Sequence, residues 1–115
     1  MVLNMRARNG FTLVEIMVVV AIIGALVSIA IPNFMRSRER STKTVCANNM
    51  RQIDAAKEQW ALEALQGQGA TVVTSDVDSY LKGSTSPKCP QKGTYDYGTI
   101  GTKPSCSIAV HTGIY

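Results

Sequence analysis

The chain has 115 residues and a formal net charge of +4, and 45% of its residues are hydrophobic. This length allows one small domain at most, and about eighty residues remain for it once a membrane-spanning stretch is set aside. A large independent core is therefore excluded, and the mild positive charge does not by itself indicate a nucleic-acid partner.

The most apolar stretch of the chain is residues 11–31, which read FTLVEIMVVVAIIGALVSIAI and are followed by Pro32. A helix of about twenty apolar residues crosses the roughly 30 Å hydrocarbon layer of a membrane. Glu15 lies in this stretch, where a lone charge at bilayer depth costs on the order of 2.5–3.5 kcal/mol. Either the favourable dipole of the nearby helix N-terminus compensates this charge, or a partner molecule does.

The residues around Glu15 form a processing pattern. A short polar leader with Arg6 and Arg8 ends in Gly10, and Phe11 opens the sequence FTLVE and the apolar run. This pattern resembles the N-terminal motif of type IV pilins and of the pseudopilins of type II secretion. The resemblance implies that a prepilin peptidase cleaves between Gly10 and Phe11 and methylates the new amino group of Phe11. It also implies that Glu15 pairs with the Phe11 amine of a neighbouring subunit.

Two alternatives remain open for the N-terminus. The leader, residues 1–10, has a more usual length if Met5 is the true start. Secretory signal peptides share the basic start and apolar middle, and residues 28–30 offer a small-x-small cleavage site. The first residue of the mature protein distinguishes a pilin-like protein from a secreted one, because the first begins at Phe11 and the second at Ile31.

Charge alone does not predict the orientation in the membrane. The flank after the apolar run carries more basic residues than the leader does, namely Arg36, Arg38, Arg40 and Lys43. The processing motif overrides this count, because its peptidase works at the cytoplasmic face. We therefore expect a single pass through the cytoplasmic membrane, with the head in the periplasm or outside the cell. The basic cluster then contacts lipid headgroups, acidic groups of adjacent subunits or solvent.

One long helix is predicted from residue 11 to about residue 66. Gly24 and Pro32 weaken its first half, so a kink is expected near Pro32. No proline or glycine interrupts residues 33–66, and Gly67 supplies the stop. Apolar positions at three- and four-residue steps predict one stripe along the second half: Cys46, Met50, Ile53, Ala56, Trp60 and Ala64.

Residues 67–115 are predicted to form a small head that covers this stripe. Residues 71–73 are typical of a short extended piece, and Ser75 resembles the start of a capping box for a short helix over residues 76–82. Residues 94–97 and 106–110 predict an antiparallel hairpin. The fold class is therefore α+β. The chain divides into a leader (1–10), an assembly helix (11–32), an amphipathic helix (33–66) and a head (67–115).

The head also resembles small pilin-like proteins of type II secretion or pilus systems, through residues 46–61, 87–90, 93–95 and 104–107. It departs from the major pseudopilin of the secretion system, because no compact run of carboxylates like the calcium-binding loop of that class is present. We therefore expect no metal and no cofactor.

Three cysteines in a head that faces an oxidising compartment suggest one disulfide and one free thiol. Cys89 and Cys106 flank the predicted hairpin, and a bond between them stabilises by about 3 kcal/mol in the chain-entropy model. Cys46 on the apolar stripe is interpreted as a small buried hydrophobe. A bond from Cys46 to either partner, and no disulfide at all, remain open. The spacing of the cysteines and His111 matches no zinc pattern, and His111 lacks the neighbours of a catalytic triad.

These observations predict a structural filament subunit and no enzyme. The implied partners are copies of the chain, other pilin-like subunits, the prepilin peptidase, an assembly ATPase, an inner-membrane platform protein and the lipid bilayer. One alternative is a minor pilin that acts as a membrane-anchored binding module for DNA uptake or adhesion. Another is a secreted, disulfide-stapled domain.

Overall fold

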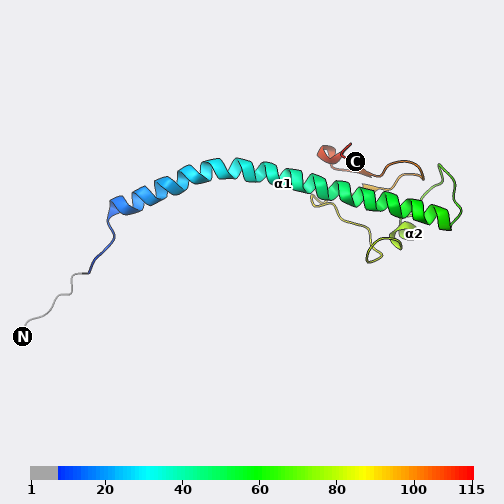
Figure 1. Ribbon diagram of the computed structural model, residues 1–115, viewed down its shortest axis with the longest axis horizontal. Coiled ribbons are helices and arrows are strands. Elements are labelled where there is room, and N and C mark those ends of the chain that lie inside the picture. Colours follow the sequence, from blue (N-terminus) through cyan, green and yellow to red (C-terminus); the bar gives the residue numbers. More distant parts are fainter. Residues whose placement is uncertain (1–7) are drawn as a thin grey trace, which may run out of the picture. The chain divides into compact units, whose positions relative to one another are not determined.

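A computed structural model describes residues 8–115 of the chain. The chain divides into two compact units, one that ends at Ser37 and one that comprises Arg38–Tyr115 (Figure 1). The elements, in chain order, are α1 (Leu13–Glu63), α2 (Thr74–Asp78), β1 (Tyr95–Asp96), β2 (Ser105–Cys106) and the 3-10 helix η1 (Ala109–His111). The α+β class predicted from the sequence is confirmed.

Helix α1 ends slightly before the predicted stop. Leu65 adopts the left-handed conformation with φ of 53°, and the N–H of Gln66 donates to the carbonyl of Ala61 at 2.9 Å. These two features form a Schellman-type cap, in which a left-handed residue reverses the chain and satisfies a terminal carbonyl. The helix therefore stops at Glu63 through Leu65, and the predicted stop, Gly67, lies beyond the cap.

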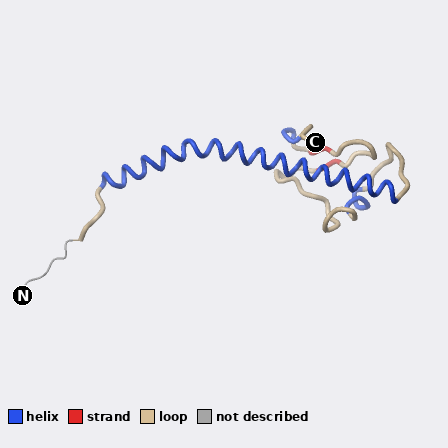
Figure 2. The backbone as a smooth tube through the Cα atoms, viewed as in Figure 1, coloured by secondary structure: helices blue, strands red, loops and turns tan. Residues whose placement is uncertain are grey.

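The buried face of α1 lies in the second unit, where the segments after Glu63 fold back along the helix (Figure 2). Ile53 and Ala56 pack against Val77, Leu81 and Tyr97 in one cluster. A second cluster joins four buried residues: Cys46, Met50, Cys89 and Cys106. The predicted cover of the stripe by the head is therefore present.

The predicted stripe is wrong at Ala64, which is exposed. Trp60 is half-buried and packs against the first cluster. Lys57 and Ala61, which were outside the predicted stripe, are buried. Positions 53, 57 and 61 follow one another at four-residue steps, and four residues make slightly more than one turn of a 3.6-residue helix. The covered face therefore drifts around the helix relative to the predicted one.

The hairpin is present but shorter than predicted. β1 pairs antiparallel with β2, with Tyr95 opposite Cys106 and Asp96 opposite Ser105. The predicted second strand does not continue to Val110, because the chain turns into η1 after Ile108. This turn carries His111 back toward the hairpin, and it places His111 in the interior.

The short helix α2 also differs in detail from the prediction. It starts at Thr74 and ends at Asp78, so Ser75 lies inside it and provides no N-cap. The predicted extended piece forms a single antiparallel bridge between Thr71 and Thr99. Past Asp78 the backbone continues in tighter turns, with the N–H of Tyr80 on the carbonyl of Val77 and the N–H of Leu81 on the carbonyl of Asp78, both at 3.0 Å. The carboxylate of Asp78 accepts hydrogen bonds from Ser86 and Tyr97.

Candidate functional site

The predicted cleavage site, Gly10 and Phe11, precedes α1 and is exposed. The side chain of Phe11 is 89% exposed, so the peptide bond before it is accessible in the isolated chain. Cleavage and methylation here stay predictions. Residues 1–7 of the leader, with Arg6 and the alternative start Met5, lie outside the described residues.

Glu15 takes part in a reciprocal cap at the start of α1. The N–H of Thr12 donates to the Glu15 carboxylate at 2.8 Å, and the N–H of Glu15 donates to the Thr12 hydroxyl at 3.3 Å. This is a capping box, in which two residues three apart satisfy orphan donors of the first turn. The sequence interpretation missed it, although T-x-x-E before an apolar run is its signal. Glu15 thus has a local partner as well as the predicted one in a neighbouring subunit.

The first half of α1 exposes its apolar side chains on every side. The large exposed residues from Leu13 to Met35 are Leu13, Val14, Ile16, Met17, Val18, Val19, Val20, Ile22, Ile23, Leu26, Val27, Ile29, Ile31, Phe34 and Met35. By length and composition α1 is able to cross a membrane near its N-terminus. A helix that is apolar all round needs lipid or other helices to cover it.

The predicted flexibility residues Gly24 and Pro32 both lie inside α1. A Cβ on Gly24 would meet nothing within 4 Å, so no packing inside this chain requires glycine there. Pro32 has no N–H to donate to the carbonyl of Ser28, and the Ser28 hydroxyl donates to the carbonyl of Ala25 at 2.7 Å. Serine back-bonding of this kind often bends helices, so the kink remains a prediction with local support.

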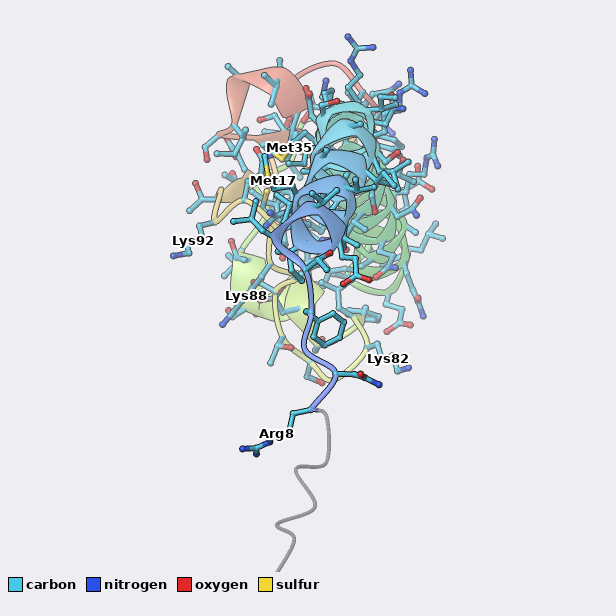
Figure 3. The ribbon with its side chains drawn as sticks, turned by 90° about the vertical axis from the view of Figure 1, so that its left-hand side faces the viewer. Arg8, Met17, Met35, Lys82, Lys88 and Lys92 are labelled. Atoms are coloured by element: carbon cyan, nitrogen blue, oxygen red, sulfur yellow. The ribbon has the colours of Figure 1, made fainter. Side chains whose placement is uncertain are left out.

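The basic residues predicted as contact candidates face outward. Arg36, Arg38 and Arg40 are exposed, and Lys43 pairs with Glu39 at 3.0 Å. In the head, three exposed lysines extend away from the ribbon: Lys82, Lys88 and Lys92 (Figure 3). An exposed ion pair adds little stability, so these side chains are available to water, lipid or a partner.

The head brings together four side chains that the sequence spacing did not connect: Cys46, Cys89, Cys106 and His111. Their ligand-type atoms all lie within 4.8 Å of one another, and all four residues are buried. The three cysteines are free thiols, and the Sγ atoms of Cys89 and Cys106 are 3.8 Å apart. A Cys89–Cys106 disulfide therefore remains a prediction. The spacing argument against a metal loses its force, because the four residues come from separate segments.

Hydrogen bonds support two of these thiols. The hydroxyl of Tyr95 donates to Cys46 Sγ at 3.5 Å, and burial raises the pKa of the Cys46 thiol to about 11. Burial also acts to raise the pKa of the Cys89 thiol. The backbone groups of Gln91 and Gly93 and the thiols of Cys106 and Cys46 together outweigh burial, so the net shift of that pKa is downward. Of these two thiols, Cys89 therefore loses its proton more readily than Cys46.

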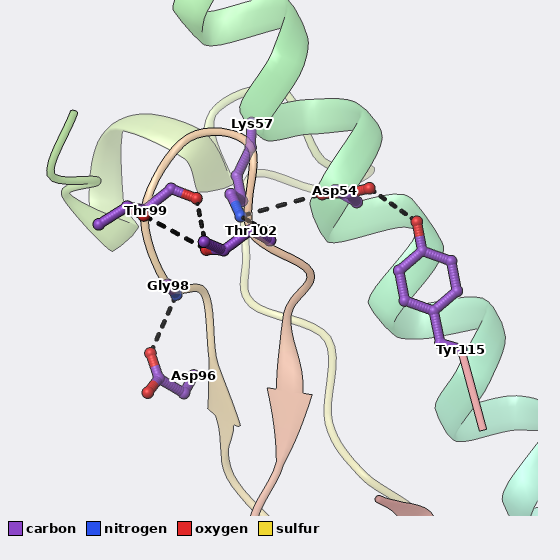
Figure 4. Close-up of polar contacts among 7 residues, drawn as sticks. All are labelled: Asp54, Lys57, Asp96, Gly98, Thr99, Thr102 and Tyr115. Atoms are coloured by element: carbon purple, nitrogen blue, oxygen red, sulfur yellow. Dashed lines mark hydrogen bonds and ion pairs between the residues drawn. The ribbon is translucent and has the colours of Figure 1, made fainter. Parts of the chain in front are cut away.

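Buried Lys57, paired with half-buried Asp54, holds the hairpin connection against α1. Lys57 Nζ donates to the carbonyl of Thr102 at 2.6 Å and lies 3.9 Å from an Asp54 carboxylate oxygen, while the Tyr115 hydroxyl donates to the other oxygen at 2.7 Å (Figure 4). Burial lowers the pKa of Lys57, and the charge of Asp54 opposes that shift. The sequence interpretation missed Lys57, because a lysine beside a stripe normally reads as solvated.

Residues 5–31 match the model of the prokaryotic N-terminal methylation motif. The type II secretion system core protein G of Pseudomonas aeruginosa is 33% identical over 85% of this chain and 78% of its own length. The type IV wide pilus major component of Thermus thermophilus is 31% identical over 95% of this chain and 78% of its own length.

A third relative matches a shorter region. The type IV major pilin of Myxococcus xanthus is 44% identical over 49% of this chain, which is 26% of that pilin. No solved structure matches the chain. The methylation motif lies at the capped start of α1, and two relatives are similar along most of the chain. The chain therefore belongs to the family of type IV pilins and type II secretion pseudopilins.

Proposed function

We propose that this chain is a structural subunit of a type II secretion pseudopilus or a type IV pilus-like filament and acts without catalysis. Cleavage between Gly10 and Phe11 releases the subunit for assembly, and residues 11–32 then pack against copies of themselves or other pilin-like subunits. The observation that carries the proposal is the exposed apolar surface of the first half of α1 with one carboxylate, Glu15, near its start.

In this mechanism the apolar surface of residues 11–32 moves from one apolar environment to another. The lipid bilayer covers it before assembly, and neighbouring helices cover it in the filament. Glu15 would then enter a medium of low dielectric constant, where an unpaired charge is costly. The amine of Phe11 on a neighbouring subunit, which stays cationic after methylation, is the counter-charge that the cleavage creates.

The partners follow from the family resemblance. A prepilin peptidase removes the leader on the cytoplasmic side, and an assembly ATPase with an inner-membrane platform protein lifts subunits out of the lipid. The chain is held in the cytoplasmic membrane by a single pass, with its head in the periplasm or outside the cell. The names of the relatives, a secretion core protein and pilus components, support both kinds of filament.

Two substitutions separate assembly pairing from helix capping. Glu15→Gln keeps an oxygen that accepts the Thr12 N–H but removes the negative charge, whereas Thr12→Ala removes the hydroxyl of the cap and keeps the charge. If the charge pairs with a neighbouring amine, Glu15→Gln gives processed monomer and almost no filament, and Thr12→Ala still assembles. Filaments sheared from the native host are quantified against the membrane fraction.

The mature mass of each variant serves as the control, because a variant that retains its leader cannot report on assembly. Filament yield at the wild-type level from correctly cleaved Glu15→Gln would refute the pairing. Equal losses in both cleaved variants would assign Glu15 a capping role alone.

A second candidate is a minor pilin whose head binds DNA or a surface. Exposed lysines of the head favour it, since their side chains extend away from the ribbon, as those of Lys82, Lys88 and Lys92 do (Figure 3). Deletion of the gene in the native host distinguishes the systems. Loss of protein export supports the pseudopilus, and loss of DNA uptake, adhesion or motility supports a pilus role.

A further inference from the structure

The strongest unassigned feature of the head is the buried Cys–His cluster. Cys46 projects from α1, Cys89 lies in the loop before β1, Cys106 ends β2 and His111 ends η1. Their exposed fractions are 0%, 5%, 7% and 0% in that order. Four residues from four segments thus converge in the interior, and each offers one atom that binds soft or borderline metal ions.

Three of the four side chains have separations close to those of a tetrahedral site. The Sγ atoms of Cys89 and Cys106 are 3.8 Å apart, and His111 Nδ1 lies 3.5 Å from the first and 3.9 Å from the second. Bonds of about 2.3 Å to sulfur and about 2.0 Å to nitrogen at tetrahedral angles give separations of about 3.8 Å for S···S and about 3.5 Å for S···N. The Cys46 sulfur lies within 4.8 Å of the other three ligand atoms. An ion at the centre would require little movement of these three side chains.

We propose that Cys46, Cys89, Cys106 and His111 bind one Zn²⁺ as a closed structural Cys₃His site. A tetrahedral set rich in thiolate selects Zn²⁺ among the divalent ions, and a fully occupied protein shell leaves no open position for catalysis. Binding releases the thiol protons and involves no change of oxidation state. The ion would fasten the loop before β1 and the C-terminal turn to α1.

The loop around Cys89 turns tightly beside the cluster. Lys92 closes the turn with its N–H on the carbonyl of Cys89 at 3.0 Å. A Cβ on Gly93 would lie 3.0 Å from Cys106 Sγ and 2.6 Å from a side-chain carbon of Ile108. Glycine at this position is therefore what lets the loop approach the second sulfur.

Outer contacts orient the remaining ligands. Asn49 donates through Nδ2 to the Tyr95 hydroxyl at 3.0 Å, and that hydroxyl donates to Cys46 Sγ. Asn49 also donates to the carbonyl of Lys88 at 3.1 Å, next to Cys89. Such second-layer contacts hold metal ligands in place. Asn49 thereby links the surroundings of Cys46 on the helix to those of Cys89 in the loop.

His111 gives an independent indication of a ligand. It is completely buried, its Nδ1 faces only thiol sulfurs, and its Nε2 has no hydrogen-bond partner among residues 8–115. Buried polar groups are normally satisfied, and S···N contacts are weak. Zn²⁺ on Nδ1 would replace these weak S···N contacts with a strong bond. The ring proton would then be on Nε2, which the ion itself does not contact. A Cys89–Cys106 disulfide, by contrast, leaves Cys46 and His111 without a polar role.

The direct test uses the full-length chain, purified in detergent micelles with an affinity tag free of histidine and without chelators. Cells are lysed anaerobically without an alkylating reagent, and the purified protein is divided into two portions. Metal content is measured in the first portion by inductively coupled plasma mass spectrometry. The second portion is denatured in the presence of an alkylating reagent, and its thiols are counted by intact mass. We expect about one zinc per chain and three reduced cysteines, with X-ray absorption showing sulfur at about 2.3 Å and one nitrogen ligand at about 2.0 Å.

Variants distinguish the zinc site from a disulfide. Cys46→Ser and His111→Gln keep Cys89 and Cys106, so a disulfide between those two still forms in both variants, whereas a zinc head loses most of its zinc. The matched control is Ser105→Ala, an exposed change beside Cys106 that keeps the metal. Stripping wild-type protein with a chelator is expected to lower its Tm by on the order of 10 °C, and stoichiometric Zn²⁺ restores it.

Cobalt keeps the test decisive if a variant fails to fold. Co²⁺ added to stripped wild-type protein is expected to give the intense bands of tetrahedral thiolate coordination, and Zn²⁺ to displace it. A Cys89–Cys106 disulfide in native material, stoichiometric iron in place of zinc, or wild-type protein without metal and without cobalt bands would each overturn the proposal.

Discussion

At the scale of single residues, Asp78 connects three segments of the head. Its two carboxylate oxygens accept hydrogen bonds from the hydroxyls of Tyr97 and Ser86. Tyr97 is buried and belongs to the cluster around Ile53. Burial, and then the hydrogen bond to Asp78, raise the pKa of Tyr97 to about 12. A hydrogen bond to a charged acceptor inside the core makes this hydroxyl a measurable part of the stability of the head.

Tyr97→Phe is expected to lower the free energy of unfolding by about 1–2 kcal/mol near pH 7, because the hydrogen bond to a carboxylate is lost with little change in packing. The ordinary pKa of tyrosine is 10.0 and the folded value is about 12. The unfolded state therefore loses its proton first, and the advantage of the wild type declines as pH rises from 10 through 12. Urea unfolding followed by the fluorescence of Trp60 measures it. A difference between the two proteins that stays constant over that pH range would contradict the assignment.

At the scale of elements, α1 has caps of two kinds. Its start is closed by the capping box of Thr12 and Glu15, and its end by the left-handed Leu65. The first cap uses the residues that capping statistics favour, whereas the second places a branched side chain where glycine is preferred. A non-glycine residue in the left-handed region costs roughly 1 kcal/mol or more. The end of α1 therefore carries strain that its side chain does not repay, since Leu65 is 92% exposed.

Leu65→Gly is expected to raise the free energy of unfolding by up to about 1 kcal/mol, because glycine adopts the left-handed conformation without strain. The matched control is Leu62→Gly, which changes an exposed leucine inside α1 and is expected to lower stability by about 1 kcal/mol. Both are measured by denaturant unfolding of the full chain in micelles. The cap assignment fails if Leu65→Gly destabilises as much as Leu62→Gly.

At the scale of the whole molecule, the two units differ in what covers their apolar residues. In the unit that ends at Ser37 the described side chains are exposed, and their cover must come from lipid or other chains. In Arg38–Tyr115 the chain supplies its own cover through two clusters on one face of α1. The first unit thus suits assembly, and the second can fold around α1.

The first residue of the mature protein tests this division. We expect protein from the native host to begin at Phe11 with one added methyl group, because the methylation motif spans residues 5–31. Intact mass and N-terminal peptide mapping measure it, and Gly10→Val, which blocks access for the peptidase, is expected to retain the leader. Material that begins at Ile31 would show a cleaved signal peptide, and unprocessed wild-type protein would remove the basis of the filament proposal.

Several features of this protein could be predicted from local patterns in its sequence. Hydrophobic length and the order Gly10, Phe11, Glu15 indicated the membrane-crossing helix and the family, because these signals lie within one stretch of chain. The long helix and the existence of the hairpin followed from periodicity and turn residues in the same way. The capping box at residues 12–15 could also have been predicted from its sequence pattern, although it was missed.

Contacts between residues far apart in the sequence could not be predicted and are known only from the folded structure. The spacing of Cys46, Cys89 and Cys106 along the chain does not say where the loop and the hairpin lie on α1, and the predicted strand would have carried His111 away from them. The burial of Lys57 likewise depends on the carbonyl of Thr102, far along the chain. Sequence patterns report interactions over a few residues, whereas a site assembled from separate segments exists only after the chain has packed.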